Sequence, residues 1–157
     1  MKGEKILFQS LNTSPEDCTF CKIVRKELPS YTIYQDDEYI AFLDINPIEK
    51  GHTLVCPKRH GETMWDMSEK EIGGLFAVVS RLSRAIVSGM DADGFRLIQN
   101  NGEAANQIVA HVHVHIIPTS FDREGARQGR VPLQRRLSFP QEIMQEVAGA
   151  IRAAVKG

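Results

Sequence analysis

The chain has 157 residues, of which 42% are hydrophobic and 25% are charged, and its formal net charge is −1. This length fits one domain whose core is large enough to fold without disulfide or metal staples. A nearly neutral chain lacks the overall basic excess of most nucleic-acid-binding proteins, so we expect no nucleic-acid partner.

The distribution of apolar residues and cysteines argues against a membrane or secreted protein. No apolar run reaches the roughly 18–20 residues that span a bilayer. Residues 1–10 contain one three-residue apolar stretch, far short of the roughly 7–15 residues of a secretory signal. The chain has three cysteines, an odd number that does not suit a disulfide framework. We therefore expect no membrane partner and a cytoplasmic location.

Turn residues and short apolar runs define the first half of the chain. Residues 1–16 are polar and are expected to form a flexible lead-in, followed by a single domain over 17–157. A short helix is predicted over 19–26, ending before Pro29. Strands are predicted over 31–34, 39–43 and 52–56, with a turn at residues 35–37 between the first two.

The clearest single prediction is a long helix that begins at Ser68. Ser68 and Glu71 have the spacing of a capping box, which satisfies amide groups of the first turn. Apolar residues then recur at helical spacing up to about residue 90. Strands over 95–98 and 111–118, a polar loop over 99–107 and a terminal helix over about 140–155 follow. This order predicts an α+β fold with a mostly antiparallel sheet.

Three of the five histidines alternate with valines, at His111, His113 and His115. Alternate residues of a strand share a face, so the imidazoles would lie together while the valines point into the core. A polar outer strand face would explain one histidine, but three beside an Asn/Gly/Gln-rich loop favour a function. Imidazole is suited both to metal ligation and to attack on phosphorus.

Cys18 and Cys21 have a spacing that lets both sulfurs face one metal ion. His60, which follows a predicted strand, and His111 would complete a closed, four-coordinate structural zinc site. A redox Cys-x-x-Cys pair is an alternative, although it would need a βαβ setting that the sequence does not predict. Two buried free thiols are a second alternative. Cys56 is expected to be a small core residue.

The segment His111-Val-His113-Val-His115-Ile-Ile resembles the signature of the histidine triad (HIT) superfamily of nucleotide hydrolases and transferases. Residues 18–29 resemble the first helix of the family, and residues 42–47 resemble its ribose-binding strand end. Residues 51–60 and 100–107 complete a match that runs from about 18 to 118. The resemblance implies an antiparallel sheet of about five strands, a long helix, a short N-terminal helix, and a sheet continued across a homodimer.

The resemblance also implies a role for each matching residue. His113 would be the nucleophile on the α-phosphorus, and His115 and Asn100 would hold the phosphate. Asp44 would accept the ribose hydroxyls and His52 would lie near the phosphates. The remaining implied contacts are a base wall of Phe20, Ile23 and Ile45, and Gln107 at the leaving side of the scissile bond. As in the zinc-bearing members of the family, structural zinc would bind Cys18, Cys21, His60 and His111.

One position departs from the pattern of the family. Ile108 stands where many relatives carry serine or threonine after the glutamine, so a hydroxyl contact to the phosphate is lost while the backbone amide remains. The departure affects the preference for a leaving group and leaves the nucleophile unchanged.

These roles predict a hydrolase that passes through a nucleotidyl-His113 intermediate, which splits one difficult displacement into two easier steps. The expected substrates are purine nucleoside phosphoramidates or dinucleoside polyphosphates such as diadenosine tetraphosphate. A nucleotidyltransferase, a nucleotide-binding regulatory protein with incidental catalysis, and a zinc-stabilised interaction module are the alternatives. The intact set of His113, Asn100 and Gln107 favours the hydrolase.

A run of arginines follows the histidines. A solvated loop is one explanation, and a phosphate clamp, which could reach across the dimer, is the other, since arginine binds phosphate bidentately. The run consists of Arg123, Arg127, Arg130, Arg135 and Arg136.

Overall fold

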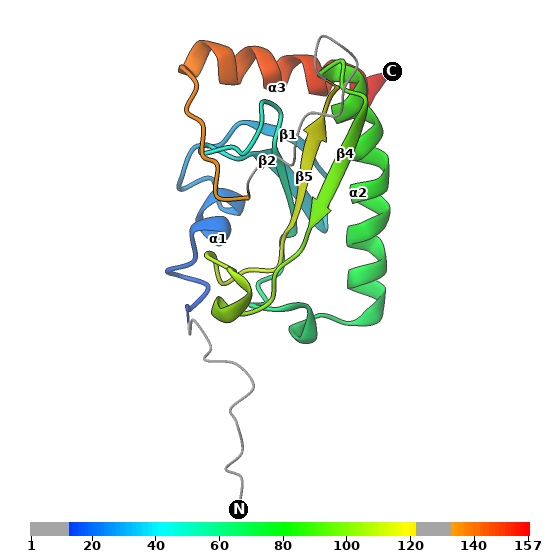
Figure 1. Cartoon of the computed structure of the whole chain (residues 1–157). Helices are drawn as coiled ribbons and strands as arrows, with labels where there is room; N and C mark the ends of the chain where they lie inside the picture. Colours follow the sequence, from blue (N-terminus) through cyan, green and yellow to red (C-terminus); the bar gives the residue numbers. More distant parts are fainter. Residues whose placement is uncertain (1–12, 122–132) are drawn as a thin grey trace, which may run out of the picture.

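The computed structural model describes residues 13–121 and 133–157 of the chain. At its centre is a five-stranded antiparallel sheet in the order β1-β2-β3-β5-β4, with the long helices α2 and α3 beside it and the short α1 on the opposite side (Figure 1). The predicted α+β class and sheet are confirmed. Most of the expected lead-in, and Arg123, Arg127 and Arg130, lie outside the described residues. The elements are α1 (Thr19–Val24), β1 (Thr32–Gln35), β2 (Tyr39–Leu43), β3 (Thr53–Pro57), α2 (Glu69–Gly89), β4 (Gly94–Ile98), β5 (Val114–Thr119) and α3 (Gln141–Lys156).

The central strands β2 and β3 are buried along their whole length. Because side chains alternate in a strand, each strand contributes to two cores. Ala41 and Val55 join the larger core beneath α2 and α3, whereas Phe42 and Leu54 join the smaller core beneath α1. Strands with no polar face fix the register of the sheet, since a shift by one residue would exchange the two cores.

Helix α2 starts as its sequence predicts. The Ser68 hydroxyl accepts from the Glu71 amide, and the Glu71 carboxylate accepts from the Ser68 amide. With 21 residues and a mean hydropathy of 1.3 in its most apolar part, α2 is long and apolar enough to cross a membrane by length and composition alone. Its Leu75, Val79 and Leu82 are instead buried against the sheet and α3, as in a core helix.

Helix α1 ends two residues earlier than predicted. Lys26 adopts a positive φ of 62°, and the amides of Glu27 and Leu28 both donate to the Lys22 carbonyl. A left-handed residue followed by bonds back to the last turn is how many helices close.

The predicted strand over 111–118 is wrong at its start, because β5 begins only at Val114. The ladder between β3 and β5 stops at the pair Val55–Val114. Beyond it, the Pro57 carbonyl bonds the ring of His111 rather than a backbone amide, and the Val112 amide donates to Gly61. His111 and His113 therefore precede β5, and only His115 lies in the strand and its ladder. Val112 and Val114 do point into the core, as predicted.

Candidate active site and metal centre

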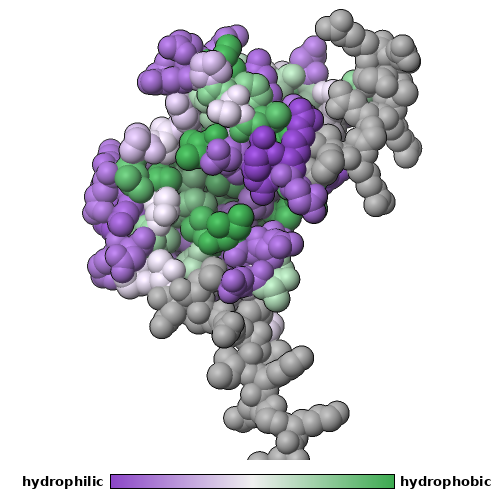
Figure 2. Space-filling view, turned by 60° about the vertical axis from the view of Figure 1, so that its left-hand side comes forward, coloured by the Kyte–Doolittle hydropathy of each residue, from purple (hydrophilic) through white to green (hydrophobic). Residues whose placement is uncertain are grey.

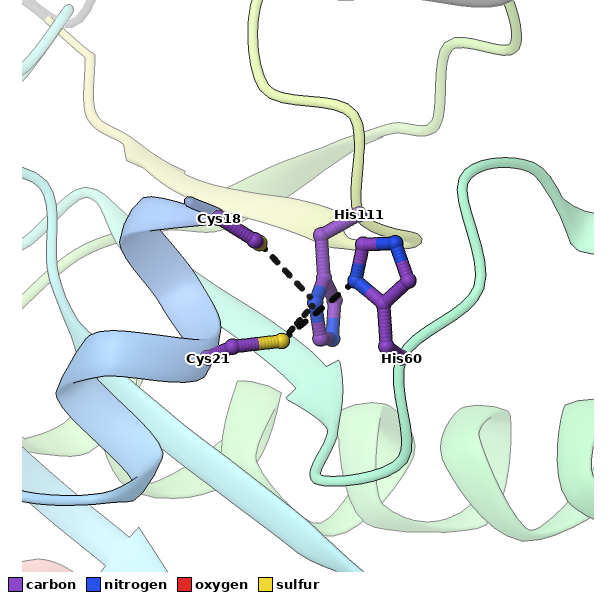
Figure 3. A group of neighbouring side chains, drawn as sticks. All are labelled: Cys18, Cys21, His60 and His111. Carbon is purple, nitrogen blue, oxygen red and sulfur yellow. Dashed lines mark hydrogen bonds between the residues drawn. The ribbon is translucent and has the colours of Figure 1, made fainter. Parts of the chain in front are cut away.

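The residues Cys18, Cys21, His60 and His111 come together from three parts of the chain (Figure 3). Cys18 precedes the first residue of α1 and Cys21 lies within it, while His60 follows β3 and His111 precedes β5. One ligand atom of each lies within 4.8 Å of the others. Nδ1 of His111 is 3.5 Å from both sulfurs, and Nδ1 of His60 is 3.3 Å from the sulfur of Cys21.

These distances and the orientation of His111 suit a tetrahedral zinc ion. With Zn–S near 2.3 Å and Zn–N near 2.0–2.1 Å, sulfur and nitrogen ligands lie about 3.5 Å apart. The Nε2 of His111 lies 2.7 Å from the Pro57 carbonyl oxygen, which can only accept, so Nε2 carries the hydrogen. The Nδ1 lone pair then faces the sulfurs, and the carbonyl serves as the outer partner that metal-binding histidines usually have.

Burial raises the thiol pKa of two cysteines, Cys21 and Cys56. Burial, followed by the bond with Cys18, raises the pKa of the Cys21 thiol to about 12, so its thiolate needs a neighbouring cation. Cys56 is fully buried in the same small core but does not belong to the four-residue cluster, and burial raises its pKa as well. The expectation of a core role for Cys56 is confirmed by its burial.

His113 has a fixed tautomer. Its Nδ1 lies 2.6 Å from the His111 carbonyl oxygen, so Nδ1 donates and the neutral ring keeps an unprotonated Nε2. Burial lowers the pKa of His113, although the His111 carbonyl and the charge of Asp44 act in the opposite direction. Within the described part of the chain, Nε2 of His113 makes no hydrogen bond.

A chain of hydrogen bonds also fixes the tautomer of His115. The Ile48 amide donates to Nδ1 of His52 at 3.0 Å, so Nε2 of His52 carries the hydrogen. That Nε2 lies 2.9 Å from Nδ1 of His115 and donates to it, which leaves the hydrogen of neutral His115 on Nε2. Burial is the largest cause that lowers the pKa of His52 to about 4 and that of His115 to about 3. Both rings are therefore neutral near pH 7.

Strand register explains how His52 reaches His115, a contact that the sequence did not predict. His115 lies opposite Leu54 of β3, and His52 lies two residues before Leu54 on the same face. The alternating pattern could have indicated this neighbour only if the pairing of β3 with β5 had been known. The resemblance alone placed His52 near the phosphates.

Asp44 lies beside this pair, directly after β2. Its amide donates to the His52 carbonyl, and its Oδ2 is 3.7 Å from Nε2 of His52. Its Oδ1 accepts from the Asn46 amide at 2.8 Å. One carboxylate oxygen thus caps the turn before Pro47, as such a residue often does. The other oxygen lies in the group formed by Asp44, His52 and His115.

The residues expected to wall a base lie at different depths. The Phe20 ring meets the His113 ring edge-on, with 5.1 Å between centroids, and packs on Phe42. Ile23 is partly buried against the same small core, whereas Ile45 is exposed. The face of the molecule that carries α1 has hydrophobic patches among hydrophilic borders (Figure 2). The apolar Phe20 ring therefore lies directly beside His113.

The loop after β4 holds Asn100 and Gln107 in contacts of its own. The buried Gln107 accepts from the Gly102 amide at 2.6 Å and donates to the carbonyls of Glu62 and Val109. Its amide thus clamps the loop and, in this conformation, has no spare hydrogen for a ligand. Asn100 donates to the Asn106 carbonyl at 3.4 Å, and within the described part of the chain it makes no hydrogen bond to a histidine. Ile108 is exposed.

Comparisons with known proteins agree with this geometry. The model of the HIT domain family matches residues 25–122, so the chain belongs to the HIT family. "Protein hit" of Bacillus subtilis is 43% identical over 136 residues, which cover 87% of this chain and 92% of that protein. "Adenylylsulfatase HINT3" of Arabidopsis thaliana is 41% identical over 107 residues, covering 68% of this chain and 54% of its own length. "Adenosine 5'-monophosphoramidase HNT1" of Saccharomyces cerevisiae is 38% identical, covering 69% and 66%.

Solved structures share the fold. A Hit-like protein from Bartonella henselae superimposes with a TM-score of 0.78 at 35% identity, covering 90% of this chain and 98% of that one. A zinc-bound histidine triad family protein from Mycobacterium smegmatis gives a TM-score of 0.77 at 35% identity, covering 91% and 96%. The HIT fold and, at a general level, a nucleotide hydrolase are thereby supported.

Proposed function

We propose that this chain hydrolyses nucleotides at the α-phosphorus, with His113 as the attacking group. The observation that carries the proposal is the bond from Nδ1 of His113 to the His111 carbonyl, which leaves the Nε2 lone pair free. A neutral imidazole is ready to attack near pH 7, because it need not lose a proton first. Attack forms a bond between Nε2 and phosphorus and releases the leaving group. Water then breaks that bond and frees the mononucleotide.

In this proposal His115 is the nearest hydrogen-bond donor to the phosphoryl group. Its ring lies 4.8 Å from that of His113, and its Nε2 carries the hydrogen because His52 donates to its Nδ1. Fixed donors that face the developing charge stabilise a transition state without reorganisation. Asn100 is the second proposed donor, on a side chain that a single long bond restrains. Gln107 would have to release one of its loop contacts to join them.

The proposed substrates are purine nucleoside phosphoramidates or dinucleoside polyphosphates, and the names of the plant and yeast relatives favour adenylyl compounds. A fluorogenic adenosine phosphoramidate tests the activity directly. We expect a burst of released fluorophore followed by slower turnover, the behaviour of a covalent intermediate. Tight nucleotide binding without release above the uncatalysed rate would instead indicate a regulatory protein.

We also propose that zinc occupies the cluster of Cys18, Cys21, His60 and His111. The donor set, the ligand distances and the zinc-bound relative from Mycobacterium smegmatis support it. A site closed by two cysteines and two histidines keeps no open position, so the ion would stabilise the fold and take no part in the reaction.

We propose a homodimer formed at β4. Among the described residues β4 pairs with β5 alone, so it forms an edge of the sheet. Phe95 and Leu97, two residues apart on one face, are 45% and 42% exposed. A second copy that paired along this edge would cover them and continue the sheet.

A charge on β4 should therefore break the dimer. We expect Leu97→Glu to shift the protein from dimer to monomer in analytical ultracentrifugation at about 10 μM. The control is Leu28→Glu, a leucine of similar exposure (39%) near the end of α1. A dimer that survives Leu97→Glu, or a wild-type monomer, would rule out this interface.

The proposed contact of Asp44 with the ribose predicts a sugar-dependent effect. A charged acceptor of hydroxyl groups contributes about 1.5–3 kcal/mol, so Asp44→Ala should weaken ribonucleotide binding about ten- to a hundredfold. Deoxyribonucleotides should bind the wild type less well and lose less on mutation. Calorimetric titration of both sugars measures the difference.

Asp44→Asn controls for the turn, because its side-chain oxygen can still accept from the Asn46 amide. Equal losses for both sugars in Asp44→Ala, repaired by Asn, would mean that Asp44 supports the turn and does not bind the ribose.

A further inference from the structure

The segment between residues 133 and 139 returns the chain to the site before α3 begins (Figure 1, orange). The Leu137 amide donates to the Pro47 carbonyl at 2.8 Å, which attaches the segment to the connection between β2 and β3. Nη1 of Arg135 lies 3.6 Å from the Glu49 carboxylate in the same connection. These contacts hold two arginines beside the turn that contains Asp44 and His52.

The two arginines differ in their partners. The charge of Arg135 is paired with Glu49. Arg136 has no carboxylate within ion-pair distance among residues 13–121 and 133–157. Its Nη1 donates to the carbonyls of Leu133 and Arg135 at 2.7 Å, which restrains the guanidinium. For the other N–H groups of Arg136, the described part of the chain offers no acceptor.

The charge of Arg136 affects the pKa of two histidines of the site. Behind burial and other neighbours, the positive charge of Arg136 contributes to the lowered pKa of both His52 and His115. The backbone bond from Leu137 to Pro47 and the ion pair of Arg135 with Glu49 place Arg136 beside the connection that ends at His52. Since the rings of both histidines are neutral near pH 7, Arg136 supplies a permanent positive charge to this end of the site.

We propose that Arg136 is a specificity-determining residue that binds a second anionic group of the substrate, next to the α-phosphate. Guanidinium groups bind phosphate and sulfate through paired N–H donors. Arg136 would thus favour nucleotides whose leaving group is itself anionic, such as phosphate, polyphosphate or sulfate. This inference rests on the proposed hydrolase and assigns its class of leaving group.

Binding tests the inference without turnover. In a His113→Ala background, calorimetry would compare adenosine diphosphate with adenosine monophosphate, which differ by one anionic group. We expect Arg136→Ala to weaken the diphosphate about ten- to a hundredfold, as for a charge-assisted hydrogen bond, and the monophosphate less than about threefold. Arg135→Ala is the matched control, and this substitution should change the affinity for either nucleotide less than about threefold.

The second part of the test measures turnover, with Arg136→Ala as the single substitution in a protein that keeps His113. With adenosine 5′-phosphosulfate, attack breaks the phosphorus–oxygen bond and sulfate leaves with the electron pair. With adenosine 5′-phosphoramidate, the phosphorus–nitrogen bond breaks, and the nitrogen takes a proton from solvent and leaves as neutral ammonia. Arg136→Ala should lower kcat/KM about ten- to a hundredfold for the phosphosulfate alone.

The proposed role of Arg136 would be overturned if Arg136→Ala lowered affinity or kcat/KM equally for both nucleotides of a pair, or for neither of them. A parent protein that turns over neither compound would contradict the hydrolase, and the ratio of diphosphate to monophosphate binding would still decide on Arg136.

Discussion

Replacement of His113 by alanine is expected to reduce turnover on the order of 10³–10⁶-fold, the range seen when an enzyme loses its nucleophile or its acid–base group. The physical reason is that, in the proposed mechanism, the lone pair of Nε2 makes the bond to phosphorus, whereas Nε2 of the neighbouring His115 carries a hydrogen. The measurement is single-turnover release from a fluorogenic adenosine phosphoramidate.

His113→Asn is the companion variant, because its side-chain amide can still donate to the His111 carbonyl. It should lose turnover as fully as alanine while keeping the thermal midpoint and the affinity for adenosine monophosphate close to wild type. A His113 variant that folds, binds and turns over near the wild-type rate would exclude His113 as the nucleophile.

The second large effect concerns the cysteines. If zinc occupies the proposed site, Cys21→Ala should abolish its binding and lower the free energy of unfolding by more than about 3 kcal/mol, since loss of a structural metal is among the most costly single changes. For a domain of this length such a loss corresponds to a fall in Tm of roughly 10 °C. Elemental analysis and calorimetric unfolding measure the two quantities together.

Cys56→Ala is the matched control, because Cys56 is buried in the same small core and lies outside the four-residue cluster. We expect it to keep about one zinc per chain and to lose on the order of 1 kcal/mol, the cost of a small cavity. Freshly purified wild-type protein without metal, or equal losses in both variants, would leave Cys21 as an ordinary core thiol.

The elements of the fold were predictable where a local signal fixes them. The capping box at Ser68 and the helical spacing behind it defined α2, and short apolar runs bounded by turn residues defined β2 and β3. The start of β5 was not predictable, because the ring of His111 takes the Pro57 carbonyl that a strand amide would otherwise bond. That exchange depends on the tertiary position of β3, which leaves no mark in the spacing of the histidines.

The residues of the candidate site were likewise only partly predictable from the sequence. The resemblance named the members of the cysteine–histidine cluster, and the fold brings all of them together. It gave Gln107 a role toward the substrate, whereas in the structure the side-chain amide already bonds Gly102, Glu62 and Val109. The contact between His52 and His115, and the approach of Arg136, depend on strand pairing and on a backbone bond to Pro47. Neither is encoded by a local motif.

His111 belongs to two centres at once. Its ring completes the cysteine–histidine cluster, and its backbone carbonyl holds the ring of His113. The histidine row is therefore not a portable module. A protein designer who transplanted the alternating histidines to another scaffold would also need to carry over the cluster and the Pro57 carbonyl that orient the first of them.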